Sequence, residues 1–177
     1  MDYTKTALLL IDIQNDYYPG GKYELFESDK ASFKAKELLE EFRKKNLLVI
    51  HVRHESIQQD AGFFLPNTFG ADIHSNVAPQ EGETVITKHQ ISSFVDTGLE
   101  SKLRNRKVEN LVICGMQTNW CVQATTLDAL NNGFRVMVIE DAVTAKNIDL
   151  HREALRKMVE NQAQMMKTEE LIKNLNQ

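Results

Sequence analysis

The sequence predicts an α/β fold: a three-layer α/β/α sandwich built on one mostly parallel sheet of about six strands. Two observations support this prediction. Short apolar runs rich in β-branched residues alternate with longer segments of helical periodicity, which is the pattern of successive βαβ units. The apolar runs are nearly continuous and rarely alternate with polar residues, so we expect strands whose two faces are both covered by helices.

Six segments have the composition of such strands, and the last has the weakest pattern. The first shows the type clearly, because an unbroken apolar run from Ala7 to Ile11 precedes Asp12. Runs of this kind pack well in a sheet, where branched side chains fit the pleated surface. The expected strands are 7–13, 47–53, 84–87, 111–115, 135–139 and 163–166.

Helices should fill most of the segments between the strands, because neighbouring parallel strands need crossover connections. Capping residues and terminating glycines indicate where these helices begin and end. One helix, for example, should end at Asn131, where Asn132 and Gly133 form a typical helix terminus. The expected helix starts are Ser28 or Asp29, a capping box at 97–100, a position near Thr118, Asp149 and Thr168.

The segment 55–82 differs from the rest of the chain. It contains Pro66 and Pro79, two of the three prolines, and its periodicity is weak. Loops of this length within a compact domain usually carry function or cover a site. We therefore expect this loop to shape the pocket.

Composition limits the classes of function. A length of 177 residues with 42% hydrophobic residues predicts one globular domain over 1–177. A net charge of −4 gives no basic face for phosphates, so we expect no nucleic-acid binding. The first apolar run is short and interrupted by Asp12, which predicts neither a signal peptide nor a membrane span. The only cysteines, Cys114 and Cys121, favour a reducing compartment over a disulfide scaffold, and we expect the cytoplasm.

Three predicted strands end in polar residues that together could perform chemistry. Asp12 ends the first strand, Lys88 ends the third, and Cys121 follows a glycine turn after the fourth. Ligands of open parallel sheets bind at this edge. Cys121 falls in the first turn of a helix, where backbone N–H groups and a nearby lysine would stabilise a thiolate. We expect Cys121 to attack, Asp12 to shuttle the proton and Lys88 to keep both anions charged, with helix-start amides as an oxyanion hole.

Each of these residues also has a purely structural interpretation. A lone aspartate can be a hydrogen-bonded core residue, and a lone lysine is usually solvated. Asp16 fits an ordinary turn, and Cys114, inside a predicted strand, is interpreted as inert core. Only the joint placement of the three residues at strand ends favours a functional site.

Three motifs resemble, in the same order, those of the isochorismatase-like cysteine hydrolases. Segment 12–17 reads D-I-Q-N-D-Y and is similar to their D-x-Q-N-D-F/Y opening. Lys88, with the pair at 93–94 and the T-G-L at 97–99, resembles their lysine segment. Segment 115–122 resembles their G-x-x-T-x-x-C-V turn. The resemblance covers nearly the whole chain.

The resemblance implies several features that composition does not. It implies the strand order 3-2-1-4-5-6, an Asp12–Lys88–Cys121 triad, an oxyanion hole from the backbone of Gln117 and Cys121, and a non-proline cis peptide at Met116–Gln117. It further implies hydrolysis of an amide-like C–N bond of a small molecule through a Cys121 thioester. No cofactor is expected, and the protein should be a homodimer or homotetramer.

One branch of the resembled family holds a metal, and the sequence departs from that branch. Nicotinamidases carry an Asp-x-His pair after the second strand and a later histidine. Here the corresponding positions are His54 and Ser56. A catalytic zinc site needs three good protein ligands, so we expect no metal. An irregular site made by His54, Glu55 and His74 is the alternative.

The pocket and the reaction class leave alternatives open. The expected substrate-contacting residues are Gln14, Tyr18, His89, Phe94 and Trp120, with ordinary packing as the alternative for the aromatic ones. Two other functions compete: vinyl-ether hydrolysis of the isochorismatase type with Asp12 as the acid, and a non-catalytic binding protein on the same scaffold. Isochorismatases commonly lack the cysteine, so Cys121 favours acyl chemistry. A binding protein has no need of all three triad residues.

Overall fold

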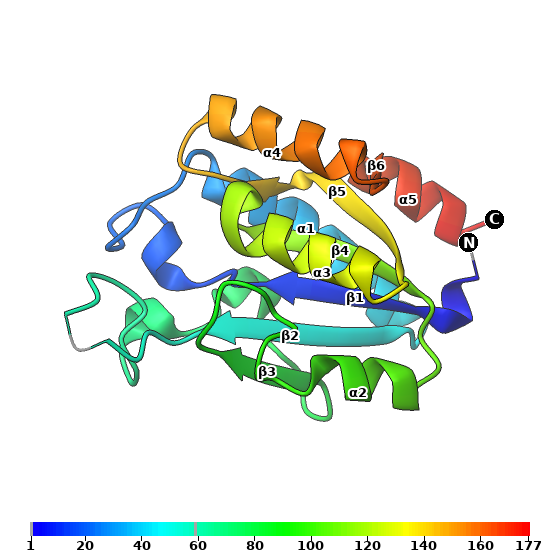
Figure 1. The fold of residues 1–177 in the computed structure, drawn as a ribbon, viewed down its shortest axis with the longest axis horizontal. Coiled ribbons are helices and arrows are strands. Elements are labelled where there is room, and N and C mark those ends of the chain that lie inside the picture. The colour runs from blue at the N-terminus through cyan, green and yellow to red at the C-terminus, as the bar shows by residue number, and fades with distance from the viewer. Residues whose placement is uncertain (1, 59) are drawn as a thin grey trace.

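Six parallel strands form one sheet in the order β3-β2-β1-β4-β5-β6, as Figure 1 shows for the computed structural model. The structure describes residues 2–58 and 60–177. Every strand pair is parallel, so the predicted sheet and its order are confirmed. The strands are β1 (Thr6–Ile11), β2 (Leu48–His54), β3 (Thr84–Lys88), β4 (Asn110–Met116), β5 (Arg135–Thr144) and β6 (Gln164–Met166).

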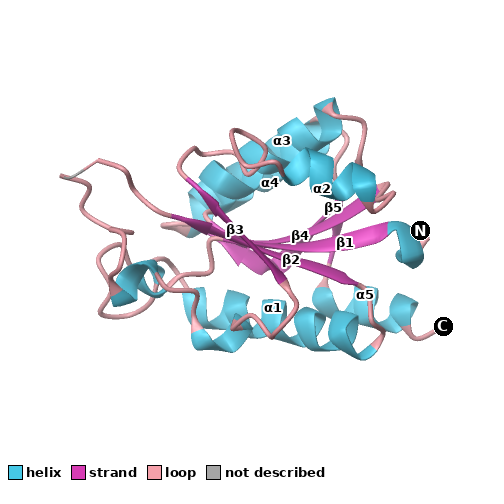
Figure 2. Cartoon of the chain, turned by 90° about the horizontal axis from the view of Figure 1, so that it is seen from below, coloured by secondary structure: helices cyan, strands magenta, loops and turns pink. Residues whose placement is uncertain are grey.

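Helices cover both faces of the sheet, which completes the three layers (Figure 2). On one side lie α1 (Ser28–Lys44) and α5 (Thr168–Leu175). The other side carries α2 (Leu99–Asn105), α3 (Gln123–Asn131) and α4 (Ile148–Glu160). In the described part of the chain, no helix is long and apolar enough to cross a membrane.

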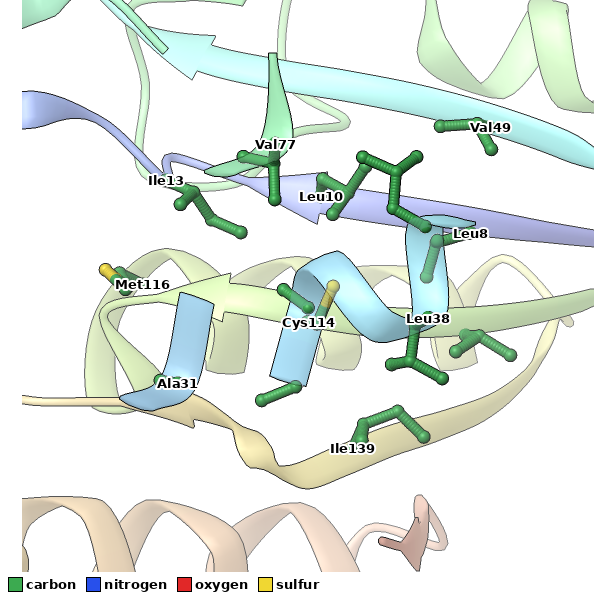
Figure 3. Packing of buried hydrophobic residues seen from close by; sticks show 14 of the residues in the cluster. Leu8, Leu10, Ile13, Ala31, Leu38, Val49, Val77, Cys114, Met116 and Ile139 are labelled. Carbon is green, nitrogen blue, oxygen red and sulfur yellow. The ribbon is translucent and has the colours of Figure 1, made fainter. Parts of the chain in front are cut away.

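The core has two halves, one on each face of the sheet. Successive strand residues point to opposite faces, so Leu8 and Leu10 of β1 join one half and Leu9 the other. Figure 3 shows side chains of the half that contains α1 residues, among them Leu8, Leu10, Leu38 and Cys114. Cys114 is fully buried there, as predicted for a core residue. Each fully buried leucine contributes about 1.5–3 kcal/mol of transfer free energy.

Several helix caps differ from those predicted from the sequence. α1 begins after Glu27, and α2 after Gly98, both in the left-handed region. The α2 capping box does not form; Thr97 Oγ1 instead accepts the Leu99 N–H at 3.2 Å. At α4 the capping residue is Asn147, whose Oδ1 accepts the Leu150 N–H at 2.9 Å, and not Asp149.

A charged cluster links β2 to the loop before β3 at the opposite end of the sheet from the pocket. Arg43 binds Glu83 through two hydrogen bonds of 2.7 and 2.8 Å, and His51 Nε2 lies 2.8 Å from Glu83 Oε2. Burial alone would raise the pKa of Glu83, but hydrogen bonds from Arg43, the Gln80 backbone and His51 lower it to about 2. The folded protein therefore stabilises the ionised form of Glu83 relative to the unfolded chain.

Replacing Glu83 with glutamine should lower the free energy of unfolding by about 1–3 kcal/mol at pH 7. Because folding lowers the pKa of Glu83, the ionised carboxylate stabilises the fold when the pH is above the unfolded pKa of 4.5. This stabilisation is lost as the pH falls towards the folded pKa of about 2. The difference between wild type and E83Q should therefore shrink from pH 7 to pH 3 in urea denaturation. E81Q, at an exposed neighbouring position, is the control. A pH-independent difference would contradict the role given to the charge.

Candidate active site

Asp12, Lys88 and Cys121 lie at the carboxyl edge of the sheet, each at or beyond the end of a different strand. Asp12 follows β1, Lys88 is the last residue of β3, and Cys121 lies in the π-helical turn Thr118–Val122 after β4. In Figure 1 the arrowheads of β1, β2 and β3 point to this edge. Asp12 has a φ of 50°, which turns its carboxylate out of the strand direction, and its N–H donates to Val52 O at 2.9 Å.

A glycine lets the nucleophile turn approach β1. Gly115 has a φ of 129°, and a Cβ placed on it would lie 2.0 Å from Ile11 O. No other residue fits without moving the backbone of β1 or β4. This close approach brings the Cys121 turn over the end of β1. The peptide bond Met116–Gln117 is cis, which confirms that prediction.

The Lys88 ammonium lies at the centre of the three predicted residues. Its Nζ is 2.8 Å from Asp12 Oδ2 and 3.3 Å from Cys121 Sγ. It also donates to Gln90 O at 3.0 Å and lies 3.2 Å from His54 Nδ1. The structure therefore brings together the three side chains that the sequence placed at separate strand ends.

Burial sets the protonation of this cluster. The side chains of Asp12 and Lys88 are fully buried, and Cys121 is 8% exposed. Burial raises the pKa of Cys121, the negative charge of Asp12 raises it further, and Lys88 opposes both. Lys88 therefore favours the thiolate form of Cys121, whereas burial and the charge of Asp12 disfavour it. Lys88 remains charged, because Asp12 and Cys121 outweigh the effect of burial and raise the Lys88 pKa.

Cys121 opens into a pocket of about 460 Å³. Its walls come from the start of the chain, from loop 55–82, from the segment after β3 and from the nucleophile turn. Aromatic and aliphatic side chains make most of the walls. The lining residues are Tyr17, Tyr23, His54, Ser56, Ile57, Gln58, Phe63, Phe64, His89, Gln90, Ile91, Gln117, Trp120 and Cys121.

Two of the five expected substrate-contacting residues line this pocket. Trp120 is 53% exposed, and His89 is fixed by a contact of 2.7 Å between its Nδ1 and Glu55 O. Gln117 also lines the pocket, as does Cys121, the other residue expected in the oxyanion hole.

The other three expected residues, Gln14, Tyr18 and Phe94, do not line the pocket and instead contact other parts of the fold. Gln14 donates to His54 O and Ala71 O at 2.8 Å each and accepts the His54 N–H at 2.8 Å, so it joins β2 to the loop. Tyr18 is 5% exposed and stacks on His74 with 3.6 Å between ring centroids. Phe94 packs near Phe134, with ring centroids 6.0 Å apart.

The aromatic wall of the pocket, and the residue that holds it in place, were not predicted from the sequence. Asp16 Oδ2 accepts the Phe64 N–H at 2.7 Å, and Oδ1 accepts the Lys22 N–H at 3.2 Å. A Cβ on Gly70 would lie 2.2 Å from Asp16 Oδ1, so the loop crosses directly over this carboxylate. Asp16 thus anchors loop 55–82 beside Tyr17. The ring centroids of Tyr17 and Phe64 are 4.7 Å apart. The only sequence signal was the inclusion of Asp16 and Tyr17 in the opening motif.

The residues of the alternative metal site do not fit a cation. His54 Nδ1 lies 3.2 Å from the Lys88 ammonium, whose charge would repel a metal at that nitrogen. His74 stacks on Tyr18, and its Nδ1 accepts the Asn76 N–H at 3.2 Å. Within residues 2–58 and 60–177, no three His, Cys, Asp or Glu side chains are grouped to hold a metal.

Comparison with known proteins gives the family. Residues 6–170 match the isochorismatase domain. An uncharacterized isochorismatase family protein of Bacillus subtilis is 45% identical over 145 residues, which cover 82% of this chain and 81% of the relative. Streptothricin hydrolase of Streptomyces noursei is 31% identical over 136 residues, covering 77% of this chain and 53% of the relative.

Similar solved structures share the fold of this chain and are named as an isochorismatase hydrolase or as amidases. A structure assigned to the isochorismatase hydrolases, from Oleispira antarctica, has a TM-score of 0.90 at 39% identity, covering 97% of this chain and 98% of that one. The pyrazinamidase of Pyrococcus horikoshii, solved with zinc, has a TM-score of 0.84 at 31% identity (92% and 99% covered). The N-carbamoylsarcosine amidase of Thermoplasma acidophilum has a TM-score of 0.83 at 26% identity (93% and 96% covered).

A parallel α/β sheet with reactive side chains at the floor of one pocket is the architecture of an α/β enzyme. This chain belongs to the isochorismatase family. Its relatives are hydrolases, and it is a hydrolase of that family.

Proposed function

We propose that this protein is a cysteine hydrolase that cleaves an amide-like C–N bond of a small molecule through a thioester on Cys121. The observation that carries the proposal is the position of Lys88 Nζ, 2.8 Å from Asp12 Oδ2 and 3.3 Å from Cys121 Sγ, at the floor of a pocket. A base, a cation and a thiol at hydrogen-bond distances form the minimal set for nucleophilic catalysis. The amidases among the relatives support the same reaction class.

The first half of the reaction forms the thioester. Asp12 accepts the thiol proton as Cys121 Sγ attacks the carbonyl carbon, and Lys88 offsets the negative charge that appears on sulfur. Asp12 Oδ1 is free for this step, because it has no hydrogen-bond partner in the described part of the chain. The backbone N–H groups of Gln117 and Cys121 stabilise the tetrahedral oxyanion. When the C–N bond breaks, protonated Asp12 gives its proton to the leaving nitrogen.

The second half hydrolyses the thioester. A water molecule attacks the carbonyl carbon while Asp12 takes its proton, and the same two amides hold the second oxyanion. The C–S bond then breaks, the carboxylic acid leaves, and the sulfur regains a proton from Asp12. Each group ends in its starting state, so no cofactor is required by this cycle.

A screen for ammonia release from small amides, carbamoyl compounds and ureido compounds tests the proposal. Enzyme quenched during turnover should carry an acyl group on the peptide that contains Cys121, as seen by mass spectrometry. A vinyl-ether hydrolase would need proton delivery to carbon and no acyl adduct. Efficient isochorismate cleavage by the C121A variant, with no amide hydrolysed by wild type, would overturn the proposal.

Activity should be independent of metal, because His54 Nδ1 lies beside the Lys88 ammonium and His74 stacks on Tyr18. Amide hydrolysis should survive prolonged treatment with EDTA or phenanthroline, and metal analysis should find less than one zinc or iron per chain. Pyrazinamidase serves as the matched positive control for metal loss, since the P. horikoshii enzyme was solved with zinc. One metal per chain, lost together with activity, would contradict this prediction.

We also propose that the protein acts in the cytoplasm as a homodimer or homotetramer. Both cysteines are free thiols, which suits a reducing compartment. The assembly follows from the family resemblance, and light scattering during size-exclusion chromatography measures it.

A further inference from the structure

His151 connects helix α4 to the turn that carries Cys121. Its Nδ1 lies 3.0 Å from the hydroxyl oxygen of Thr118, which is the first residue of the π-helical turn Thr118–Val122. The two residues are 33 positions apart in the chain, and α4 packs against the turn. Among the described residues that line the pocket, neither of them is found. The proposed reaction therefore gives no direct role to either side chain.

The Thr118 hydroxyl depends on this contact, because the turn itself offers it no carbonyl. Thr118 is fully buried, and a buried hydroxyl without a partner is costly. A threonine inside a helix can donate to the carbonyl four residues earlier. Here the preceding residue, Gln117, is extended, so no earlier turn supplies that carbonyl. The partner comes from another element, and it is His151.

The imidazole of His151 can hold the hydroxyl in either tautomer. Burial lowers the pKa of His151 below its ordinary value of 6.5, although the charge of Glu140 opposes this effect, so the ring is neutral at pH 7. A neutral ring has one donor and one acceptor nitrogen, and a hydroxyl can both donate and accept. The contact at Nδ1 is therefore a hydrogen bond whichever nitrogen carries the proton.

The turn that begins at Thr118 carries the groups that the nucleophile segment would contribute to the reaction. Cys121 is three residues further along, and the backbone N–H groups of Gln117 and Cys121 form the proposed oxyanion hole. The sulfur of Cys121 must also stay near Lys88, whose Nζ is 3.3 Å away. A displacement of about 1 Å at a reacting group can lower the rate about a hundredfold. Whatever fixes the turn therefore affects the chemistry.

We infer that His151 is a positioning residue, which fixes the nucleophile turn through the Thr118 hydroxyl and so keeps Cys121 at its distance from Lys88. The close approach of Gly115 to β1 fixes where the turn begins, and His151 holds it from α4. This inference rests on the proposed role of Cys121 and adds a residue outside the pocket on which that role depends.

The alkylation rate of Cys121 tests the inference without any substrate. Replacing His151 with leucine keeps most of the bulk of the side chain but removes the hydrogen bond to Thr118. The turn should then move relative to Lys88, so that iodoacetamide labels Cys121 about tenfold more slowly at pH 7, with the pH midpoint shifted upward. R156Q, at an exposed position of α4, should be labelled like wild type.

Two polar substitutions at His151 separate the hydrogen bond from packing. Asparagine places its amide near the position of Nδ1 and can donate or accept, whereas glutamine reaches the position of Nε2. H151N should therefore recover most of the labelling rate, and H151Q should be labelled as slowly as H151L. A role in packing alone would give the opposite order, because glutamine is closer to histidine in size.

A double-mutant cycle with Thr118→Val shows whether His151 acts through that hydroxyl. T118V and H151L should slow the labelling of Cys121 by similar factors, and the double variant should be no slower than either single variant. Additive effects, or labelling of H151L at the wild-type rate, would overturn the inference.

The outcomes separate this inference from the proposed function. If the labelling rate depends on the pair of His151 and Thr118 but wild type hydrolyses no amide, the proposed reaction fails and the positioning role stands. If an amide is hydrolysed, H151L should lower kcat and leave KM nearly unchanged, because neither residue is among the described residues that line the pocket. An unchanged kcat in H151L would contradict the positioning role and leave the proposed reaction standing.

Discussion

Replacing Cys121 with alanine should reduce amide hydrolysis by a factor of about 10⁴ or more. The loss is large because the thioester route ends when the sulfur is removed, and Asp12 and Lys88 alone offer no nucleophile. The fold should survive, since Cys121 is small and borders the open pocket, so little cavity is created. Steady-state kinetics and thermal unfolding of the same preparation measure the two effects.

Cys114→Ala is the matched control for this variant. Cys114 is the only other cysteine, is fully buried in the core and does not line the pocket. C114A should keep wild-type kcat/KM and lose about 1 kcal/mol of stability through a small cavity. Alkylation by iodoacetamide should label wild type at Cys121 and leave Cys114 unlabelled until the protein unfolds. Substantial hydrolysis by C121A would remove Cys121 from the mechanism.

Replacing Lys88 with methionine should damage both reactivity and stability. The ammonium lowers the pKa of Cys121 against the opposing effects of burial and Asp12, so its removal raises that pKa further. Alkylation of Cys121 should slow at neutral pH, and its pH midpoint should move upward. Asp12 would be left as a buried charge without a partner, which costs about 3–5 kcal/mol in the free energy of unfolding.

A double variant separates these two effects. Asp12→Asn combined with Lys88→Met removes both charges and keeps the shapes, so most of the lost stability should return while hydrolysis stays absent. K102M, at an exposed lysine of α2, should change neither property. An unchanged alkylation profile in K88M would show that Lys88 does not act on the sulfur. If the double variant is no more stable than K88M, the lost stability has another cause than the unpaired Asp12.

Sequence patterns were enough to predict the sheet and the candidate reactive residues. Continuous apolar runs require cover on both faces, and parallel strands require helical crossovers, so periodicity was enough to predict the layers. Asp12, Lys88 and Cys121 could be found because Asp12 and Lys88 lie at strand ends and Cys121 lies in the turn that follows β4, and strand ends meet at one edge. Strand order and the cis peptide at Met116–Gln117 came from family resemblance, because local pattern carries no information about either.

The residues that line the pocket and the burial of Cys121 depend on contacts between distant parts of the chain. Tyr18 and Phe94 resemble pocket residues in sequence, but their rings face His74 and Phe134. Phe64 enters the pocket because Asp16 binds its N–H across 48 positions, a contact that no local pattern encodes. Burial likewise raises the pKa of Cys121, and residues of loop 55–82 line the pocket onto which Cys121 opens. Proximity along the chain predicts secondary structure, whereas desolvation and long-range contacts are properties of the folded molecule.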